Sequence, residues 1–405
     1  MKRKFRLFGD IGFTGDLKLL ILIGGLYSLS MAMSNTFVNI YLWKQSGKFS
    51  DLALYNFFVF ILQPITFIFA GRWAKNVDRV ILLRVGVFFL AIFYLVVLIA
   101  GTHASRYILL LGGLLGIGYG FYWLSFNLLT FEVTEPDTRD FFNGFLGTLT
   151  SIGGMIGPMS AGLIITHLEK FIGYSIVFGC SLALFSLAVF LSFFLKGRPA
   201  HGKYELKRIL AERKQNENWR RITNAHFFQG LREGTFLFVI SVLVFLSTDS
   251  ELALGTFGLV NSFVSFIVYF AVSRFIKKEY RKKAILAGGI ILYAAVFFIV
   301  SDVTYVKLLV YSSMIAIGYP ILLIPYMSMT FDVIGGSWKA AEMRIEYIVV
   351  REIFLNGGRV ISILLFLFAV TQFNERKSIP IILLVMGAGH TVIYWCIRKI
   401  NIETV

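Results

Sequence analysis

The chain is poor in the residues that build catalytic and metal-binding sites. Only 15% of its 405 residues are charged, and it has 23 acidic residues, 5 histidines and 2 cysteines. Cys180 and Cys396 fall in separate apolar segments without metal-ligand spacing, and we expect both to be buried free thiols. The histidines are scattered, and the GxxxxGK[ST] phosphate loop is missing. We therefore expect no metal, no cofactor, no enzymatic catalysis and no direct use of ATP.

Long apolar segments dominate the sequence instead. Hydrophobic residues make up 57% of the chain and its mean hydropathy is +0.75, whereas the surface of a soluble domain needs far more charge. A helix needs about 20 apolar residues to cross a hydrocarbon core of roughly 30 Å. We predict an all-α integral membrane protein with about twelve transmembrane helices. The predicted spans are 18–43, 51–73, 80–101, 107–131, 141–166, 171–195, 224–247, 252–275, 284–301, 304–331, 345–370 and 379–397.

The distribution of lysine and arginine predicts the orientation in the membrane. With the N-terminus inside, the cytoplasmic segments and helix ends hold 29 of the 39 basic residues, and the opposite segments hold 7. This is the bias that the positive-inside rule describes. We expect a multi-pass protein of the cytoplasmic membrane with both termini in the cytoplasm. The same bias explains the net charge of +16 without nucleic-acid binding.

The sequence predicts two related halves. The longest polar stretch, 196–222, is a basic linker that separates residues 1–195 from residues 223–405, and each part is predicted to form a six-helix bundle. Three patterns recur at offsets of 199–202 residues: GYGFYWLSFNLLTFEV and GYPILLIPYMSMTFDV, GRWAK and SRFIK, and NTF and GTF. Such internal repeats indicate a duplicated unit, as found in many secondary transporters.

A short apolar edge lies inside the linker. Leu206, Ile209 and Leu210 form this edge, and basic residues surround it. The pattern predicts either an amphipathic helix lying on an anionic inner leaflet or a plain solvated linker.

The region between the second and third predicted helices carries a family signature. GRWAKNVDRV resembles the Gly-x-x-x-Asp-x-x-Gly-Arg-Arg motif of the major facilitator superfamily, whose members share six plus six helices and a basic central loop. Gly71 and Arg79 match, whereas Lys75 stands at the acidic position and Asp78 where glycine is common. The resemblance implies a gating role for Gly71, Arg72, Asp78 and Arg79, with Asp78 as the candidate to supply the missing acid from a shifted position. More narrowly, the chain resembles the YqgE-like branch from Bacillus-type bacteria, which implies the fold and transport but no substrate.

A second motif lies in the segment 141–166. Gly153, Gly157, Pro158 and Gly162 resemble the Gly-x-x-x-Gly-Pro-x-x-Gly-Gly motif of antiporters in the superfamily. Small residues four apart let helices approach closely, and proline bends a helix. The resemblance implies a position at the seam between the halves and favours exporter-type antiport over uptake. Generic small-residue packing is the alternative.

The segment 345–370 carries charges where it crosses the membrane. Charged groups at mid-bilayer cost about 2.5–3.5 kcal/mol, so they usually face a cavity and serve function. Glu352, Asn356 and Arg359 are spaced by four and three residues, which puts them on one helix face. Arg351 points about 100° away from Glu352. We predict that this polar stripe takes part in transport or coupling.

The segment 224–247 adds Arg232 and Glu233 near the middle of the membrane, with Gln229 as a polar residue of the cavity. The superfamily architecture implies that Arg232 or Glu233 faces Arg359 or Glu352. Two hypotheses follow. The set binds substrate or exchanges a proton, or its Arg–Glu pairs only hold two helices together. We favour the first, because desolvation offsets much of the energy that a buried ion pair gains.

The first half has no charge near the middle of the membrane to match these residues. Its polar candidates for the cavity are Asn35, Asn39, Gln63 and Asn127. Hydrogen bonding between helices is the alternative role for each of them.

Two acidic residues related by the repeat lie at the inner ends of their helices. Glu132 precedes Arg139, and Asp332 precedes Arg344, in each case at the start of the next segment. We predict that these acid–base pairs close the cytoplasmic rim. Ordinary exposed ion pairs, which stabilise a protein little, are the alternative.

The main hypothesis is therefore a secondary active transporter that moves a small polar or amphipathic solute by alternating access. We expect it to be proton-coupled, monomeric and surrounded by membrane lipid. Two alternatives stay open: a flippase for lipids or lipid-linked precursors, and a non-transporting sensor or assembly partner with the same fold. The imperfect loop motif supports the last, and the charges inside the membrane argue against it.

Overall fold

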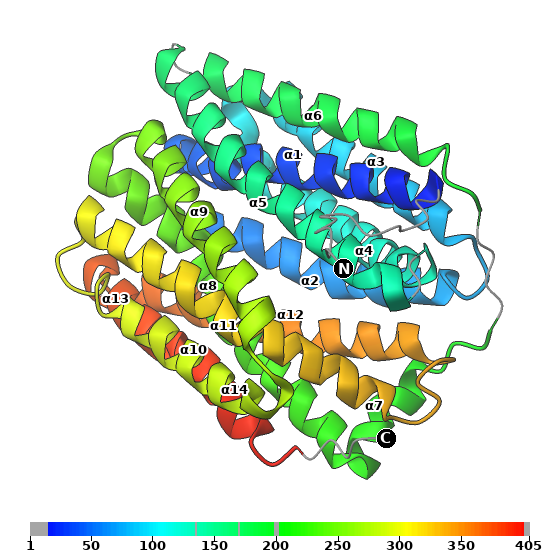
Figure 1. The fold of residues 1–405 in the computed structure, drawn as a ribbon. Helices are drawn as coiled ribbons and strands as arrows, with labels where there is room; N and C mark the ends of the chain where they lie inside the picture. Colours follow the sequence, from blue (N-terminus) through cyan, green and yellow to red (C-terminus); the bar gives the residue numbers. More distant parts are fainter. Residues whose placement is uncertain (1–14, 134–135, 169–170, 198–201, 401–405) are drawn as a thin grey trace, which may run out of the picture.

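The protein consists of long helices, most of which run roughly side by side (Figure 1). The computed structural model describes residues 15–133, 136–168, 171–197 and 202–400, with the side chains of 131–144 and 273–275 outside the described part. The first half comprises α1 (Gly15–Ser46), α2 (Phe49–Trp73), α3 (Arg79–Ala100), α4 (Ile108–Val133), α5 (Pro136–His167) and α6 (Ile172–Ser192). After the linker helix α7 (Leu206–Gln215) come α8 (Glu217–Thr248), α9 (Glu251–Phe275), α10 (Arg281–Val296), α11 (Tyr305–Gly335), α12 (Arg344–Gln372), α13 (Glu375–Gly387) and α14 (Gly389–Ile397).

The membrane spans agree with the sequence prediction. Ten runs in the described part are long and apolar enough to cross a membrane. One of them, 79–130, contains both α3 and α4, joined by the 3-10 helix η1 (Gly101–Tyr107). The 16-residue α10 is too short to count among the ten. With α3 and α4 counted separately and α10 included, the described helices reproduce the twelve predicted spans.

The last span is broken, which the sequence did not predict. Instead of one helix over 379–397, the chain turns at Ala388 between α13 and α14. A Cβ atom on Gly389 would lie 2.5 Å from the backbone oxygen of Phe228, so glycine is needed for α14 to pack directly on α8. The interruption at Ala388 therefore places His390 beside the middle of α8.

The helix packing repeats from one half to the other. In the first half α2 and α3 pack on α4, and α1 packs on α5 and α6; in the second half α9 and α10 pack on α11, and α8 packs on α12 and α14. The two most extensive contacts between the halves are α2 with α12 and α5 with α9. Since α2 corresponds to α9 and α5 to α12, these contacts are the same interface made twice. The predicted pair of pseudo-symmetric bundles is confirmed.

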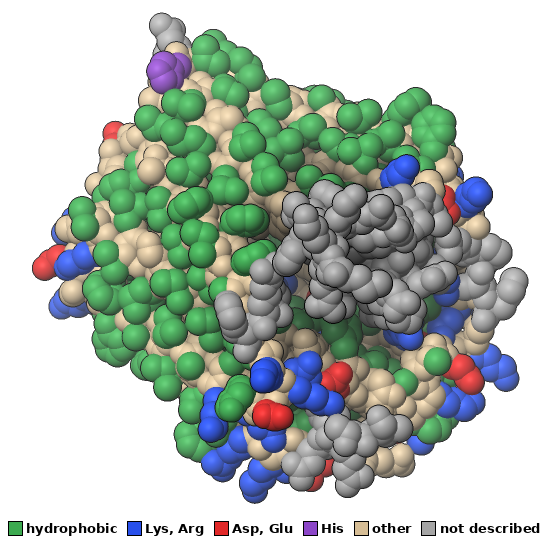
Figure 2. Space-filling view, viewed as in Figure 1, with side chains coloured by type: hydrophobic (Ala, Val, Ile, Leu, Met, Phe, Trp, Pro, Cys, Tyr) green, Lys and Arg blue, Asp and Glu red, His purple; other side chains and the backbone are tan. Residues whose placement is uncertain are grey.

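The outer surface suits a lipid environment. Hydrophobic side chains cover the face over α5, α6 and α9, whereas most visible lysines and arginines lie along the lower and right-hand border of the view, the end of the molecule that carries the linker and α7 (Figure 2). Cys180 is exposed on such a surface and Cys396 is partly exposed, so the prediction of two buried thiols is wrong, although both are free.

The linker helix α7 lies against the second half. Ile209 is fully buried, and its carbonyl accepts a hydrogen bond of 3.2 Å from the indole of Trp219. Arg213 lies over the ring of Phe354 in α12 at 4.0 Å. The apolar edge that was predicted for a membrane surface or for solvent is thus largely a protein contact, with Leu210 left exposed.

Candidate functional site

Helices α8 and α12 cross with their backbones in contact, because glycines occupy the crossing. A Cβ atom on Gly230 would lie 1.8 Å from the carbonyl oxygen of Leu355, and one on Gly358 would lie 2.0 Å from that of Phe227. Glycine is thus required at both positions for the helices to approach this closely. The crossing brings side chains from the middle of each helix within reach of each other.

An ion pair between Glu233 and Arg359 forms the centre of the site. Nη2 and Nε of Arg359 lie 2.6 Å and 3.2 Å from the same oxygen, Oε2 of Glu233. The two side chains are only 8% and 16% exposed. Charges buried this deeply need a partner. Of the pairings predicted from the sequence, the structure contains the one between Glu233 and Arg359.

From Arg359 a chain of contacts continues along α12. Nη1 of Arg359 donates to Oδ1 of Asn356 (3.2 Å), and Nδ2 of Asn356 donates to Oε2 of Glu352 (3.3 Å). The sequence placed Arg351 on another face, yet its Nη2 lies 2.6 Å from Oε1 of Glu352. The long guanidinium side chain reaches round the helix, which a count of helical angles does not reveal. Arg359 therefore touches one carboxylate directly and a second through Asn356.

The other oxygen of Glu233 is also engaged. Oε1 accepts hydrogen bonds from Nε2 of Gln229 (2.9 Å) and from the hydroxyl of Tyr319 in α11 (3.2 Å). Gln229, predicted as a cavity residue, is buried beside the carboxylate. Glu233 thus accepts hydrogen bonds from three side chains on three helices.

Two histidines belong to the site although the sequence did not single them out. His226 contacts Oε1 of Gln229 (3.0 Å) and the hydroxyl of Thr330 (3.2 Å). Nε2 of His390 lies 4.0 Å from Glu233, and within the described part neither ring nitrogen of His390 has a hydrogen-bond partner. His226 precedes Glu233 by seven residues, about two helical turns, which was a usable signal. His390 gave none, because its position depends on the break at Ala388.

Arg232 lies apart from this network. Its Nη2 donates to the hydroxyl of Tyr311 (3.3 Å), and its guanidinium lies 4.5 Å from the ring centre of Phe236. The sequence treated Arg232 and Glu233 as equal candidates for pairing with α12. Neighbouring positions on a helix point about 100° apart, and here only Glu233 pairs with α12.

One aromatic ring of the first half reaches the site. Phe60 in α2 lies 5.0 Å from the Arg359 guanidinium, a cation–π distance. Because α2 and α12 belong to different halves, the Glu233–Arg359 pair lies next to the seam between them.

The polar candidates of the first half mainly bind each other. Nδ2 of Asn39 donates to the carbonyl of Asn35 (3.3 Å), and Oδ1 of Asn39 accepts from Asn56 (3.0 Å). These contacts join α1 to α2, which fits the helix-packing role. Gln63 is buried and Asn127 is partly exposed, and among the described residues no hydrogen bond or ion pair brings either of them to the network on α8 and α12.

The small-residue motif of α5 lies at the second seam. A Cβ atom on Gly157 would lie 2.9 Å from Met33 in α1, and one on Gly162 would lie 2.7 Å from the carbonyl oxygen of Glu251 in α9. In the same way, a Cβ atom on Gly255 in α9 would lie against the carbonyl oxygen of Pro158. Gly153 packs on α1. The motif thus permits close contact with both α1 and α9.

At the end of the seam near the linker, Lys75 joins the two halves. Its Nζ lies 3.1 Å from Oε1 of Glu346 and donates to the carbonyl of Glu342 (2.7 Å), and both charged side chains are buried. The backbone N–H of Glu205 donates to the same Oε1 (3.1 Å). Lys75, which stands at the acidic position of the family motif, therefore has an acidic partner in the first turn of α12, where a negative charge is also favoured by the helix dipole.

The other residues of the loop motif have mostly local roles. Asp78, the candidate for the missing acid of the motif, caps α3 by accepting the N–H of Val80 (2.8 Å). Gly71 lets α2 approach Val349, since a Cβ atom there would lie 3.0 Å from its methyl group. Arg72 is exposed, and Arg79 is partly buried at the start of α3.

The structure describes the side chains of only one of the two acid–base pairs that were predicted at the cytoplasmic rim. Oδ2 of Asp332 lies 2.7 Å from Nη1 of Arg281, within the second half, and not beside Arg344 as predicted from the sequence. Glu132 and Arg139 lie outside the described side chains. Nothing in the sequence pattern singled out Arg281, at the start of α10, as the partner of Asp332.

The opposite end of the molecule has an ion pair that sequence reasoning missed. Nζ of Lys44 in α1 lies 2.7 Å from Oε1 of Glu251 at the start of α9, and the hydroxyl of Tyr174 donates to the same oxygen (2.8 Å). Each half contributes one charge, as in the Lys75–Glu346 pair. The two ion pairs thus join the halves at opposite ends of the helices.

Adjacent glycines on α12 provide a test of the helix crossing. We expect Gly358→Ala to lower the free energy of unfolding by about 1–3 kcal/mol or more, because the added methyl group meets backbone on α8. Gly357→Ala is the control, because nothing lies within 4 Å of its Cβ position, and it should gain up to about 1 kcal/mol of helix stability. Unfolding in detergent measures both. Equal effects of the two substitutions would contradict the crossing.

Comparison with family models places the chain in one family. The model of a family described as "Major Facilitator Superfamily" matches residues 20–343. A Bacillus subtilis (strain 168) protein named YqgE is 58% identical over 403 residues, which cover 100% of this chain and 94% of that protein. A Geobacillus stearothermophilus protein from the sodM 3′ region is 55% identical over 198 residues, 49% of this chain and 92% of its own length. The crystal structure of the human organic anion transporter MFSD10 (TETRAN) is similar with a TM-score of 0.68 at 14% identity, covering 94% of this chain and 98% of that one.

Proposed function

Since this chain belongs to the major facilitator superfamily and is a membrane transporter, we propose that it exchanges a small polar or amphipathic solute for protons by alternating access. The protein acts as a monomer in the cytoplasmic membrane with both termini in the cytoplasm. The excess of basic residues on the linker side supports this orientation.

The observation that carries the proposal is the buried Glu233–Arg359 pair beside the seam between the halves. A carboxylate inside a membrane is costly to keep charged, and its charge is retained here by a single cation. Protonation of Glu233 removes the negative charge that holds the Arg359 guanidinium in place. The guanidinium can then move toward Asn356 and Glu352, which accept its hydrogen bonds in an alternative position. Glu233 is therefore the group we assign to proton exchange.

Exchange of solute for proton follows from competition at Glu233. A solute that offers a hydrogen-bond donor to this carboxylate excludes the proton, and a bound proton excludes the solute. The Glu233 carboxyl group then binds the solute in one half of the transport cycle and the proton in the other. The close packing of the α5 motif on α1 and α9 agrees with the antiporter resemblance of that motif.

Alternating access requires contacts that close each side in turn. We assign the Lys75–Glu346 pair to the cytoplasmic side and the Lys44–Glu251 pair to the external side. This assignment also bears on the non-transporting alternative. That alternative rested on the imperfect loop motif, and Lys75 makes a buried contact with the other half despite the imperfection.

The proposal is tested in inverted vesicles with an imposed pH gradient, screened against a solute library. Wild-type protein should show solute-dependent proton movement, and Glu233→Gln should abolish it while the protein still inserts and folds. Glu352→Gln should slow it, because Arg359 loses its alternative partner. Glu375→Gln is the control, because Glu375 is exposed at the start of α13. Normal coupling in Glu233→Gln would refute the assigned role of this residue.

A further inference from the structure

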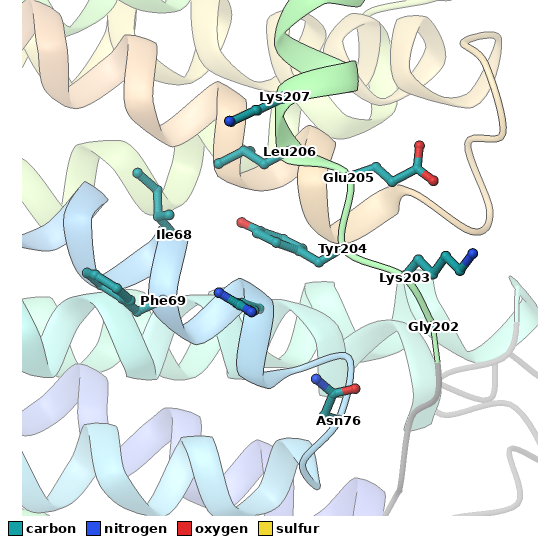
Figure 3. Close-up of a pocket in the computed structure, with 10 residues that line it drawn as sticks. Ile68, Phe69, Asn76, Gly202, Lys203, Tyr204, Glu205, Leu206 and Lys207 are labelled. Atoms are coloured by element: carbon teal, nitrogen blue, oxygen red, sulfur yellow. The ribbon is translucent and has the colours of Figure 1, made fainter.

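The structure has a pocket that the proposed transport cycle does not use. It lies between the end of α2 and the start of the linker helix and has a volume of about 720 Å³, which is within the range of small-molecule sites. Figure 3 shows the pocket with its lining residues. They are Ile68, Phe69, Arg72 and Asn76 on one side and the linker residues 202–207 on the other.

Two cations face this pocket from its two sides. Arg72 comes from the last turn of α2 and Lys207 from the first turn of α7, and both are exposed. Neither side chain has an ion-pair or hydrogen-bond partner within the described residues. Lys203 and Glu205 extend away from Ile68 and Phe69, so they line the pocket mainly with backbone (Figure 3). The pocket therefore attracts an anion.

The same pocket is continuous with a lipid-facing surface. Ile68, Phe69 and Leu206 form its apolar part. Phe69 is 60% exposed and the neighbouring Trp73 is 51% exposed at the end of this membrane span. Aromatic residues at the end of a span lie at the level of the lipid headgroups. A soluble anion would leave this apolar surface uncovered.

Tyr204 supplies an unused hydrogen-bond donor. Its hydroxyl oxygen is buried and has no hydrogen-bond partner among the described residues. Burial raises the pKa of this phenol, so the group stays protonated at neutral pH. A buried donor without a partner is costly unless a ligand accepts its hydrogen bond.

We propose that this pocket binds an anionic phospholipid of the cytoplasmic leaflet. Arg72 and Lys207 bind the headgroup phosphate, Tyr204 donates to it, and Phe69 with Ile68 covers the adjoining part of the acyl chains. The proposal does not depend on which solute is transported. A lipid bound here also ties the linker to α2 close to the Lys75–Glu346 pair, since Gly71 on α2 lies against both Tyr204 and Val349.

The test measures lipid binding by the purified full chain in detergent. Phosphatidylglycerol, phosphatidylcholine and inorganic phosphate are each titrated, and the rise of the thermal unfolding midpoint gives an apparent Kd. Phosphatidylglycerol should bind, and the double variant R72Q/K207Q should weaken it about 30-fold, which corresponds to about 1 kcal/mol for each cation. Tyr204→Phe should weaken binding less while leaving the charge unchanged.

The matched control is K277Q/K278Q, which removes the same charge from exposed residues between α9 and α10. This variant should bind phosphatidylglycerol as wild type does. Equal weakening in both double variants would mean nonspecific attraction to anionic lipid and would overturn the proposal. So would inorganic phosphate raising the midpoint as phosphatidylglycerol does, since the ligand would then be a soluble anion. If R72Q/K207Q does not fold, the single variants R72Q and K207Q replace it, and wild-type binding by both of them decides against the site.

Discussion

Replacing Arg359 with methionine should lower the free energy of unfolding by about 3–5 kcal/mol, because the Glu233 carboxyl would then be buried inside the membrane without its cation, whether it stays charged or takes up a proton. Arg359 supplies both of the short contacts to Oε2 of Glu233, at 2.6 Å and 3.2 Å. The remaining donors to this carboxylate, Gln229 and Tyr319, are neutral and bind the other oxygen. They stabilise the charge less than a guanidinium does.

The double variant Glu233→Gln/Arg359→Met separates the two hypotheses on the buried charges. A neutral pair removes the unpaired charge, so most of the lost stability should return. If the ion pair serves transport, this variant is stable and still does not couple solute to protons. If the pair only holds α8 to α12, stability and transport return together, which would overturn the function proposed for Glu233. Unfolding in detergent and the vesicle assay are run on the same preparations, with Arg376→Met, an exposed arginine, as the control.

Reversing the charge of Lys75 should open the seam near the linker. Lys75→Glu puts a carboxylate where Glu346 now has a cation at 3.1 Å, so attraction becomes repulsion between two buried groups. We expect the closed form of this end to lose roughly 3 kcal/mol, on the order of a 100-fold change in the open population. Transport should fall, because the side that must close no longer does.

Val349 provides the probe for this opening. It is fully buried and lies against Gly71 in the same seam. With the two natural cysteines replaced, Val349→Cys should react slowly with a water-soluble maleimide, and much faster once Lys75→Glu is added. The exchanged pair K75E/E346K should restore slow labelling and transport. Fast labelling in the exchanged pair would show that the charges of Lys75 and Glu346 do not close the seam by pairing.

The fold could be predicted from the sequence because most of the signals that determine it are local. Apolar runs, basic loops and the repeat offset predicted the helices and the two halves, the loop motif carried the resemblance to the superfamily, and all three predictions are confirmed. The YqgE-like branch is confirmed as well. The last span is present as predicted. Its interruption at Ala388 was not predicted, because it depends on contact between Gly389 and α8 and not on a local signal.

The candidate site was less predictable, because it depends on side-chain reach and on partners distant in sequence. Helical spacing found Glu352, Asn356 and Arg359, but it could not show that Arg351 bends back to Glu352. It could not choose Glu233 over Arg232, or Arg281 as the partner of Asp332. Lys75 was read as a departure from the family motif. Only the fold shows that the acid facing it, Glu346, comes from the other half.

The two seams between the halves differ in what must change when they move. On the α2–α12 side, the ion pair of Lys75 with Glu346 has to separate and be hydrated. On the α5–α9 side, Gly162 and Gly255 face backbone carbonyl groups directly. That surface has few side-chain rotamers to exchange, so it can slide with little rearrangement. The activation enthalpy of the conformational step should therefore come mainly from the ion pairs that close the two ends, Lys75–Glu346 and Lys44–Glu251, which makes the temperature dependence of transport a property of two pairs of charges.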